Sequence, residues 1–585
     1  MTTTDEKKAD AAETSTVQNG ENEEDSGNSE SDETGNGRES KRRGFLAAVV
    51  GAVGFLAVVA LVVGNAAPEP PTEFAVLDRA PTIYPDYRDV TIPPNVAPLN
   101  FDVQENAERF VVCVFEDGAE ESVATFSGKE IRFSQRKWRR LLERNVGKAL
   151  RFELFALNVD ERESGEDRRN GESERNGENG RSGEKRAEKE NGGGWVKYAG
   201  WEMRVASEPI DPWVSYRLVF PGYEYYSDLA LWSRSLETFE ERPIIRARLV
   251  AERTCVNCHT FQAGRTDSFL FHLRFKNGGT VVVDRGAVKK VDLNAEGLDA
   301  GCAYAAWRPN SPRVAFSSNL TSQIFHSRNK NRINVIDSFS DLLLYDVEKN
   351  ELTPILPSDD DYLPTYPTWS PDGKTLYYCC AKAPDFKTPR QPVEARKDEV
   401  PFVQDEFQYD IMKVDFDEKT KTFGAPERVF DAVALDKSAA FPRVSPDGKS
   451  LMFTLARRGC FPIWFRDADL WTLDLTTGKA RALDEVNSPT EPDSYHSWSS
   501  NGRWFVFSSR RDDGSHTRLY FAHIGENGEV SKPFMLPQRD PAKTLNATKS
   551  FNVPELTVEP VQISERELLR DAKNETPEKA TLRLR

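Results

Sequence analysis

A strand–turn–strand unit recurs four times in the second half of the chain and limits the folds that it can adopt. Each copy starts at an aromatic residue or valine, passes through a tight turn built on Pro-Asp-Gly or a variant, and ends in an apolar run. Further apolar strands separate the copies. Strand sets that recur at this scale are typical of a β-propeller. The copies span residues 305–317, 368–378, 443–453 and 497–507.

The spacing of these copies predicts blades that carry loop insertions. Their anchor residues stand 62, 75 and 54 residues apart, which exceeds the roughly 40–50 residues of a compact blade. Four copies do not close a ring. A weaker hairpin at 269–283 is a candidate for a further blade, and 552–558 is a candidate closing strand. The anchors are Trp307, Trp369, Val444 and Trp498.

A second constraint is the sequence Cys255-Val-Asn-Cys258-His259. Two cysteines separated by two residues and followed by histidine form the attachment signature of c-type haem. The thiols add to the haem vinyl groups, and the histidine is the proximal iron ligand. With 7 cysteines and 6 histidines in 585 residues, such a match arises by chance in about one chain in a thousand. We therefore predict haem c on Cys255, Cys258 and His259.

Three alternative interpretations of this motif are a redox-active dithiol followed by an unrelated histidine, half of a zinc site, and a structural turn in the core. Zinc needs about four ligands, and the sequence has no second Cys-x-x-Cys and no His-x-x-x-His.

The second iron ligand is histidine, methionine, water or nothing. We expect His326, because it lies in a polar loop between two strand runs. His272 is the alternative, in an apolar strand thirteen residues after His259. The remaining histidines and the methionines of apolar strands are read as structural. These are His496, His516, His523, Met203, Met412 and Met452.

An uncharged apolar run at 44–64 is long enough to span a bilayer. Lys41, Arg42 and Arg43 precede it, and positive charge stays on the cytoplasmic side. We expect a single-pass membrane protein with a cytoplasmic N-terminus and most of the chain in the periplasm or otherwise outside the cytoplasm, where haem c is attached. A cleaved signal peptide that ends near residues 65–67 is the alternative.

Composition divides the rest of the chain. Residues 1–43 hold 12 acidic and 6 basic side chains and few apolar ones, as expected of a disordered acidic tail. A second charged block at 160–194 is predicted to be a disordered insertion. No basic stripe is present, which excludes nucleic acid as a partner.

The part outside the membrane is predicted to be mainly β, in two domains. After a linker at 65–91, a small β-rich domain spans 92–253 and includes helices at 134–146 and 227–241. The haem motif and propeller span 254–563, and 564–585 is a C-terminal tail. This division places the motif at the border between the two domains.

The repeat Trp369-Ser-Pro-Asp-Gly-Lys374 resembles the TolB-type propeller repeat, which implies about six blades, with five or seven as alternatives. From 81 to 563 the chain resembles an uncharacterised family of bacterial envelope proteins that joins a haem c motif to a TolB-like (WD40-like) propeller. The matching stretches are 93–101, 216–223, 255–261, 271–274 and 494–499.

Three functions fit these features. The first is a membrane-anchored, cytochrome c-like electron carrier whose propeller docks an envelope partner. The second is an interaction module of TolB-like type with a structural or vestigial haem. The third is a haem-dependent oxidoreductase. No Gly-x-Ser-x-Gly motif is present, which disfavours a hydrolase.

Overall fold

A computed structural model describes residues 68–159, 194–222, 225–326, 333–359, 361–385 and 406–584. The predicted acidic tail, the apolar run at 44–64 and nearly all of the charged insertion lie outside these ranges. Within them, no helix is both long and apolar enough to cross a bilayer. The predicted membrane anchor therefore stays a prediction.

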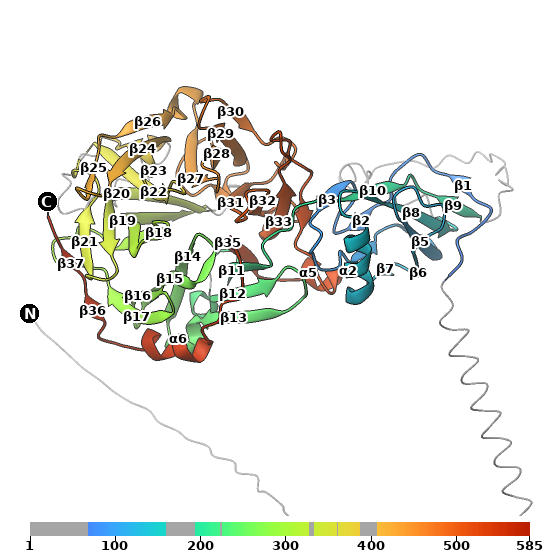
Figure 1. Cartoon of the computed structure of the whole chain (residues 1–585), viewed down its shortest axis with the longest axis horizontal. Coiled ribbons are helices and arrows are strands. Elements are labelled where there is room, and N and C mark those ends of the chain that lie inside the picture. The colour runs from blue at the N-terminus through green and yellow to red at the C-terminus, as the bar shows by residue number, and fades with distance from the viewer. Residues whose placement is uncertain are drawn as a thin grey trace, which may run out of the picture. The chain divides into compact units, whose positions relative to one another are not determined.

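Six sheets are arranged in a ring (Figure 1), which confirms a propeller of six blades. Five blades are built from consecutive strands. Blade 1 holds β14 (Thr254–Gln262), β15 (Arg265–Phe275), β16 (Gly279–Asp284) and β17 (Ala287–Asp292); blade 2 holds β18 (Cys302–Trp307), β19 (Arg313–Phe325), β20 (Ile333–Asp346) and β21 (Glu351–Pro354). Blade 3 holds β22 (Tyr362–Trp369), β23 (Thr375–Lys382), β24 (Tyr409–Asp417), β25 (Thr422–Phe423) and β26 (Glu427–Phe430); blade 4 holds β27 (Ser438–Val444), β28 (Ser450–Ala456), β29 (Asp469–Asp474) and β30 (Ala480–Ala482). Blade 5 holds β31 (Asp493–Trp498), β32 (Trp504–Ser509), β33 (Arg518–His523) and β34 (Phe534–Met535).

Blade 6 joins two distant parts of the chain and closes the ring. Its innermost strand is β35 (Ser550–Thr557), which pairs with β11 (Trp213–Val219). Two more strands follow outward, β12 (Ala230–Ser235) and β13 (Glu241–Arg246). The expected closing strand is thus confirmed. The predicted domain boundary at residue 253 is wrong, because residues 213–246 belong to the propeller.

The helix predicted at 227–241 is also wrong. That segment forms one short 3-10 turn and then strand β12. Its apolar residues matched a helical spacing, but pairing with β11 on one side and β13 on the other satisfies the backbone as a sheet. Tertiary pairing overrides local propensity in such short segments.

The predicted C-terminal tail at 564–585 forms regular structure in its described part, residues 564–584. Helix α6 (Glu565–Ala572) begins at a capping box made by Ser564 and Glu567. Two short strands follow, β36 (Glu578–Lys579) and β37 (Thr581–Leu582), and they extend blades 1 and 2 at the outer edge. The Arg246 guanidinium pairs with the Glu565 carboxylate at 2.5 Å and joins α6 to blade 6.

The small domain holds a seven-stranded sheet, a three-stranded sheet and a helix. The predicted helix is confirmed as α2 (Gln135–Arg144), which buries Trp138, Leu141 and Leu142. The predicted linker at 65–91 is partly wrong, because its described part enters this domain through three short strands. The sheet and its neighbouring strands are β1 (Ala75–Val76), β2 (Ile83–Tyr84), β3 (Val90–Ile92), β4 (Phe101–Val103), β5 (Arg109–Phe115), β6 (Ala124–Ser127), β7 (Glu130–Ile131), β8 (Ala149–Leu157), β9 (Trp195–Lys197) and β10 (Trp201–Val205).

Candidate cofactor cavity on the propeller axis

The innermost strand of every blade carries a β-bulge at the same place. In each blade, two consecutive residues of the innermost strand have no partner in the strand pairing, whereas only one residue of the adjacent strand is left unpaired opposite them. Such a bulge redirects the side chains next to it and is often found beside active sites. The bulged pairs are Cys258-His259, Tyr304-Ala305, Tyr366-Pro367, Phe441-Pro442, Tyr495-His496 and Val553-Pro554.

In five of the six bulges the first residue adopts a positive φ, between 43° and 54°. This conformation is uncommon for residues other than glycine. Four of those residues are aromatic. The Cys-x-x-Cys-His motif therefore places a cysteine where four other blades place an aromatic residue and blade 6 a valine, and a histidine where three of the other blades place proline.

The four aromatic residues form a continuous arc across blades 2 to 5. The ring centroids of Tyr304 and Tyr366 are 4.4 Å apart, those of Tyr366 and Phe441 4.3 Å, and those of Phe441 and Tyr495 4.7 Å. Such spacings favour tilted aromatic contacts. We did not predict this arc, although each member stands three residues before the anchor of its repeat.

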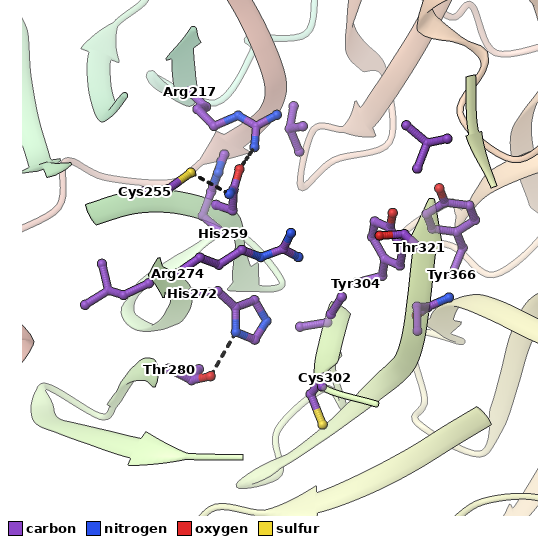
Figure 2. A pocket seen from close by; sticks show the side chains of 18 of the residues that line it. Arg217, Cys255, His259, His272, Arg274, Thr280, Cys302, Tyr304, Thr321 and Tyr366 are labelled. Atoms are coloured by element: carbon purple, nitrogen blue, oxygen red, sulfur yellow. Dashed lines mark hydrogen bonds between the residues drawn. The ribbon is translucent and has the colours of Figure 1, made fainter. Parts of the chain in front are cut away.

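A cavity of about 490 Å³ lies on the axis of the ring (Figure 2). Innermost strands of all six blades line it, and its size is that of a pocket for a cofactor or small molecule. The motif therefore faces the axis and does not lie at the border with the small domain, because blade 6 precedes it in the chain. One lining residue from each blade is His259, Tyr304, Tyr366, Arg443, His496 and Glu555.

His259 is buried on the cavity wall. Within the described ranges neither of its ring nitrogens has a hydrogen-bond partner. Burial, with a smaller effect of the Arg217 guanidinium, lowers the pKa of His259 to about 3, so its imidazole is neutral. A neutral imidazole is the form that binds a metal ion, and unsatisfied buried nitrogens are costly unless a ligand satisfies them.

The residues before His259 are held in place by blade 6. Asn257 donates from Nδ2 to the Cys255 sulfur at 2.8 Å, and Arg217 donates to the Asn257 side-chain oxygen. Cys255 and His259 both line the cavity. Cys258 lies in β14 between them, but its side chain is outside the described part of the chain.

His272, in β15, lines the same cavity as His259 (Figure 2). Its Nδ1 is 2.8 Å from the Thr280 hydroxyl, and its Nε2 has no partner in the described part of the chain. Burial, then Arg274, lowers the pKa of His272 to about 3. In a metal-binding histidine, one ring nitrogen usually makes a hydrogen bond that fixes the ring, and the other nitrogen binds the metal.

His326 lies elsewhere. It directly follows β19 and is not among the residues that line the cavity. Thus the structure brings His259 and His272 to one cavity and leaves His326 outside it. Among the described residues, no three His, Cys, Asp or Glu side chains are grouped to hold a bare metal ion.

A buried carboxyl group, Asp337 of β20, lies next to the cavity wall. Its Oδ2 accepts hydrogen bonds from Asn319 Nδ2 at 2.9 Å and from the Cys460 thiol at 3.8 Å. Its Oδ1 has no partner within the described ranges. Burial raises the pKa of Asp337 from 3.8 to about 7. Asn319 itself lines the cavity.

This carboxyl predicts a pH dependence of stability. Between pH 4 and pH 7 the folded state holds a proton on Asp337 that the unfolded chain has lost, so the free energy of unfolding falls as pH rises through this window and stays lower above it. We expect Asp337→Asn to raise stability at pH 8 by on the order of 1–3 kcal/mol. Urea unfolding at pH 5 and pH 8 measures this, with exposed Asp385→Asn as the control. An equal pH dependence in wild type and Asp337→Asn would contradict the assignment.

No protein-family model matches the chain, and no curated protein matches it. Many solved structures are similar to it, among them the following three. TolB from Acinetobacter baumannii is 15% identical with a TM-score of 0.34, over 56% of this chain and 68% of TolB. Puromycin hydrolase is 14% identical with a TM-score of 0.32, over 55% of this chain and 45% of the hydrolase. Oligogalacturonate lyase in complex with manganese is 13% identical with a TM-score of 0.32, over 52% of this chain and 69% of the lyase. The propeller assignment rests on the sheet order of this chain itself.

Proposed function

We propose that this protein is a membrane-anchored c-type cytochrome whose axial propeller cavity holds one haem and that it transfers electrons in the cell envelope. The observation that carries the proposal is His259. It ends a Cys-x-x-Cys-His motif, it is buried on the wall of a cavity, and both of its ring nitrogens lack partners within the described ranges.

In this proposal Cys255 and Cys258 hold the haem through thioether bonds, and His259 binds its iron. The haem supplies reversible one-electron chemistry. The chain itself supplies the surroundings. The aromatic arc forms an apolar wall, and the hydrogen bond from Asn257 fixes the Cys255 sulfur on the cavity side. A fixed and largely apolar surrounding is one of the means by which proteins set a haem potential.

The cavity also reaches the protein surface, as electron exchange requires. Tyr226 and Phe275 both line the cavity. Their side chains are 37% and 66% exposed, and their ring centroids are 4.8 Å apart. We propose that this edge, between blades 6 and 1, meets the envelope partner, while residues 44–64 keep the protein at the membrane.

Whether a second protein side chain would bind the haem iron distinguishes an electron-transfer protein from a haem enzyme. Iron with two protein ligands favours transfer, and an open position favours a haem-dependent oxidoreductase. His272 supports the first, because it lines the cavity and has an unpartnered Nε2 within the described ranges. We therefore propose His272 as the second ligand in preference to His326.

We expect His272→Ala to convert a low-spin haem spectrum to a high-spin one, because removing an axial histidine lowers the ligand field at the iron. His326→Ala is the matched control and should leave the spectrum unchanged. Electronic absorption and electron paramagnetic resonance spectra of the oxidised proteins measure this. A low-spin spectrum that persists in His272→Ala would remove His272 from the iron.

An interaction module with a structural haem is the main alternative. It predicts that envelope partners are captured equally by wild type and by the Cys255→Ala, Cys258→Ala double variant. Electron transfer predicts that envelope extracts reduce and reoxidise the haem of the wild type. If capture is unchanged in the double variant and no extract alters the haem spectrum, the alternative is the better account.

A further inference from the structure

Helix α2 of the small domain has a strongly basic outer face. Five of its ten residues are arginine or lysine, and one is acidic. Trp138, Leu141 and Leu142 are buried in the core, so the charged side chains lie on the opposite face of the helix. The chain as a whole is acidic, with a formal charge of −16, and this helix is a local exception. Its basic residues, all exposed, are Arg136, Lys137, Arg139, Arg140 and Arg144.

Most of this basic face has no counter-ion in the described part of the chain. Arg144 pairs with the Glu116 carboxylate at 2.7 Å. The other four basic residues form no ion pair and no side-chain hydrogen bond with a described residue. Their charges therefore face solvent and are open to an anion from outside the domain.

The placement of these charges works against the helix itself. The first turn contains Arg136 and Lys137 and no acidic residue, although the N-terminal end of a helix dipole is positive and favours negative charge. Arg136, Arg140 and Arg144 stand four residues apart, on one line along the helix, where like charges repel each other. Contacts within the helix do not offset this repulsion, whereas an anionic surface outside it would.

The proposed anchor holds the small domain close to a membrane. Only ten residues, 65–74, separate the apolar run at 44–64 from strand β1. A fully extended chain of this length reaches about 35 Å at most. Such a short tether keeps the domain at a high effective concentration next to the lipid headgroups, and anionic headgroups attract basic segments of a protein that lie beside the bilayer. A soluble polyanion has no such confinement.

We propose that the basic face of α2 binds the anionic lipid headgroups of the membrane in which the protein is anchored. The inference rests on the anchor of the proposed function. The contact is electrostatic, because the apolar side of α2 is buried in the small domain. Guanidinium groups bind phosphate through paired, charge-assisted hydrogen bonds. This contact orients the small domain at the bilayer surface.

The test uses the full chain in lipid nanodiscs, made either of phosphatidylcholine alone or of equal parts of phosphatidylcholine and anionic phosphatidylglycerol. Acetylation of Lys137 by a water-soluble reagent is followed by mass spectrometry. We expect its rate to fall about fivefold on the anionic discs and to recover in high salt, which screens exposed charges. Lys419, an exposed lysine between β24 and β25 of blade 3, is the control site and should react equally on both discs.

A pair of double variants makes this test specific to α2. Arg136→Gln with Arg140→Gln should restore the rate at Lys137 on the anionic discs. Arg566→Gln with Arg570→Gln is the matched control, because it changes two exposed arginines at the same spacing on α6. This control should leave the slow rate at Lys137 unchanged.

The outcomes separate the α2 contact from the anchor. Equal rates at Lys137 on the two discs, in a chain that stays in them through an alkaline wash, would overturn the contact and leave the anchor in place. A chain that the wash removes has no anchor. Salt-sensitive binding of that chain to anionic vesicles, lost in the Arg136→Gln, Arg140→Gln variant, would still establish the α2 surface, and no binding would overturn it. Slower acetylation with soluble polyglutamate, but not with anionic lipid, would assign α2 to an acidic protein and overturn the membrane contact.

Discussion

Serine in place of both Cys255 and Cys258 will abolish covalently attached haem. The two thioether bonds need both sulfurs, and His259 alone cannot keep haem through denaturation. Wild type should retain a haem stain on denaturing gels and after acid-acetone extraction, and the double variant should lose all of it. Haem content per chain, measured by the stain and by the mass of the intact protein, is the observable.

Cys302→Ser is the matched control for this experiment. Cys302 lines the same cavity but lies outside the motif, so its loss should leave the haem stain unchanged. A double variant that stains like the wild type would show that the attachment is elsewhere, and equal loss in Cys302→Ser would point to a general defect in folding.

A chain that ends at residue 548 will not form a stable propeller. It lacks β35, the innermost strand of blade 6, and leaves β11 without its partner on the axis side. The expected loss exceeds the whole net stability of a typical domain, about 5–15 kcal/mol. Far-UV circular dichroism on heating should show no cooperative transition, and limited proteolysis should degrade residues 213–545.

Two further chains make this test specific. A chain that ends at residue 573 keeps β35 and α6 but loses β36 and β37, which only extend blades at the outer edge. It should melt cooperatively, a few degrees below the full chain. Leu556→Asp places a charge on a buried position of β35 and should lower the melting temperature far more. A cooperative melt of the 548-residue chain at the temperature of the longer one would contradict closure by β35.

The propeller could be predicted because four of its blades repeat one local pattern. An aromatic residue or valine, a turn built on Pro-Asp-Gly or a variant, and an apolar strand recur within each copy, as in Thr368–Tyr378. Blade 6 has no such marker. Its strands come from the two ends of the propeller segment, residues 213–246 and 550–557, and the sequence of β12 taken alone favours a helix. These segments join one sheet only through pairing between distant parts of the chain. A local sequence pattern does not predict which distant strands pair.

The candidate site was predictable to the extent that its residues are close in sequence. Cys255, His259 and His272 lie within two neighbouring strands of blade 1, and the structure brings them to one cavity. The polar loop around His326 favours it as a ligand on sequence grounds, but the residue directly follows β19 and does not line the cavity. Arg217 and Arg443 line the same cavity but come from different blades and lie more than two hundred residues apart, so no local pattern could place them together.

The pyridine haemochrome spectrum of the mature wild-type protein, produced together with a periplasmic haem-attachment system, tests the central claim most directly. It distinguishes haem held by two thioethers from haem held by one or none and gives the amount per chain. We predict one haem per chain with the spectrum of two thioether bonds, in agreement with one Cys-x-x-Cys-His motif. A fully folded protein without a haemochrome band would contradict the account.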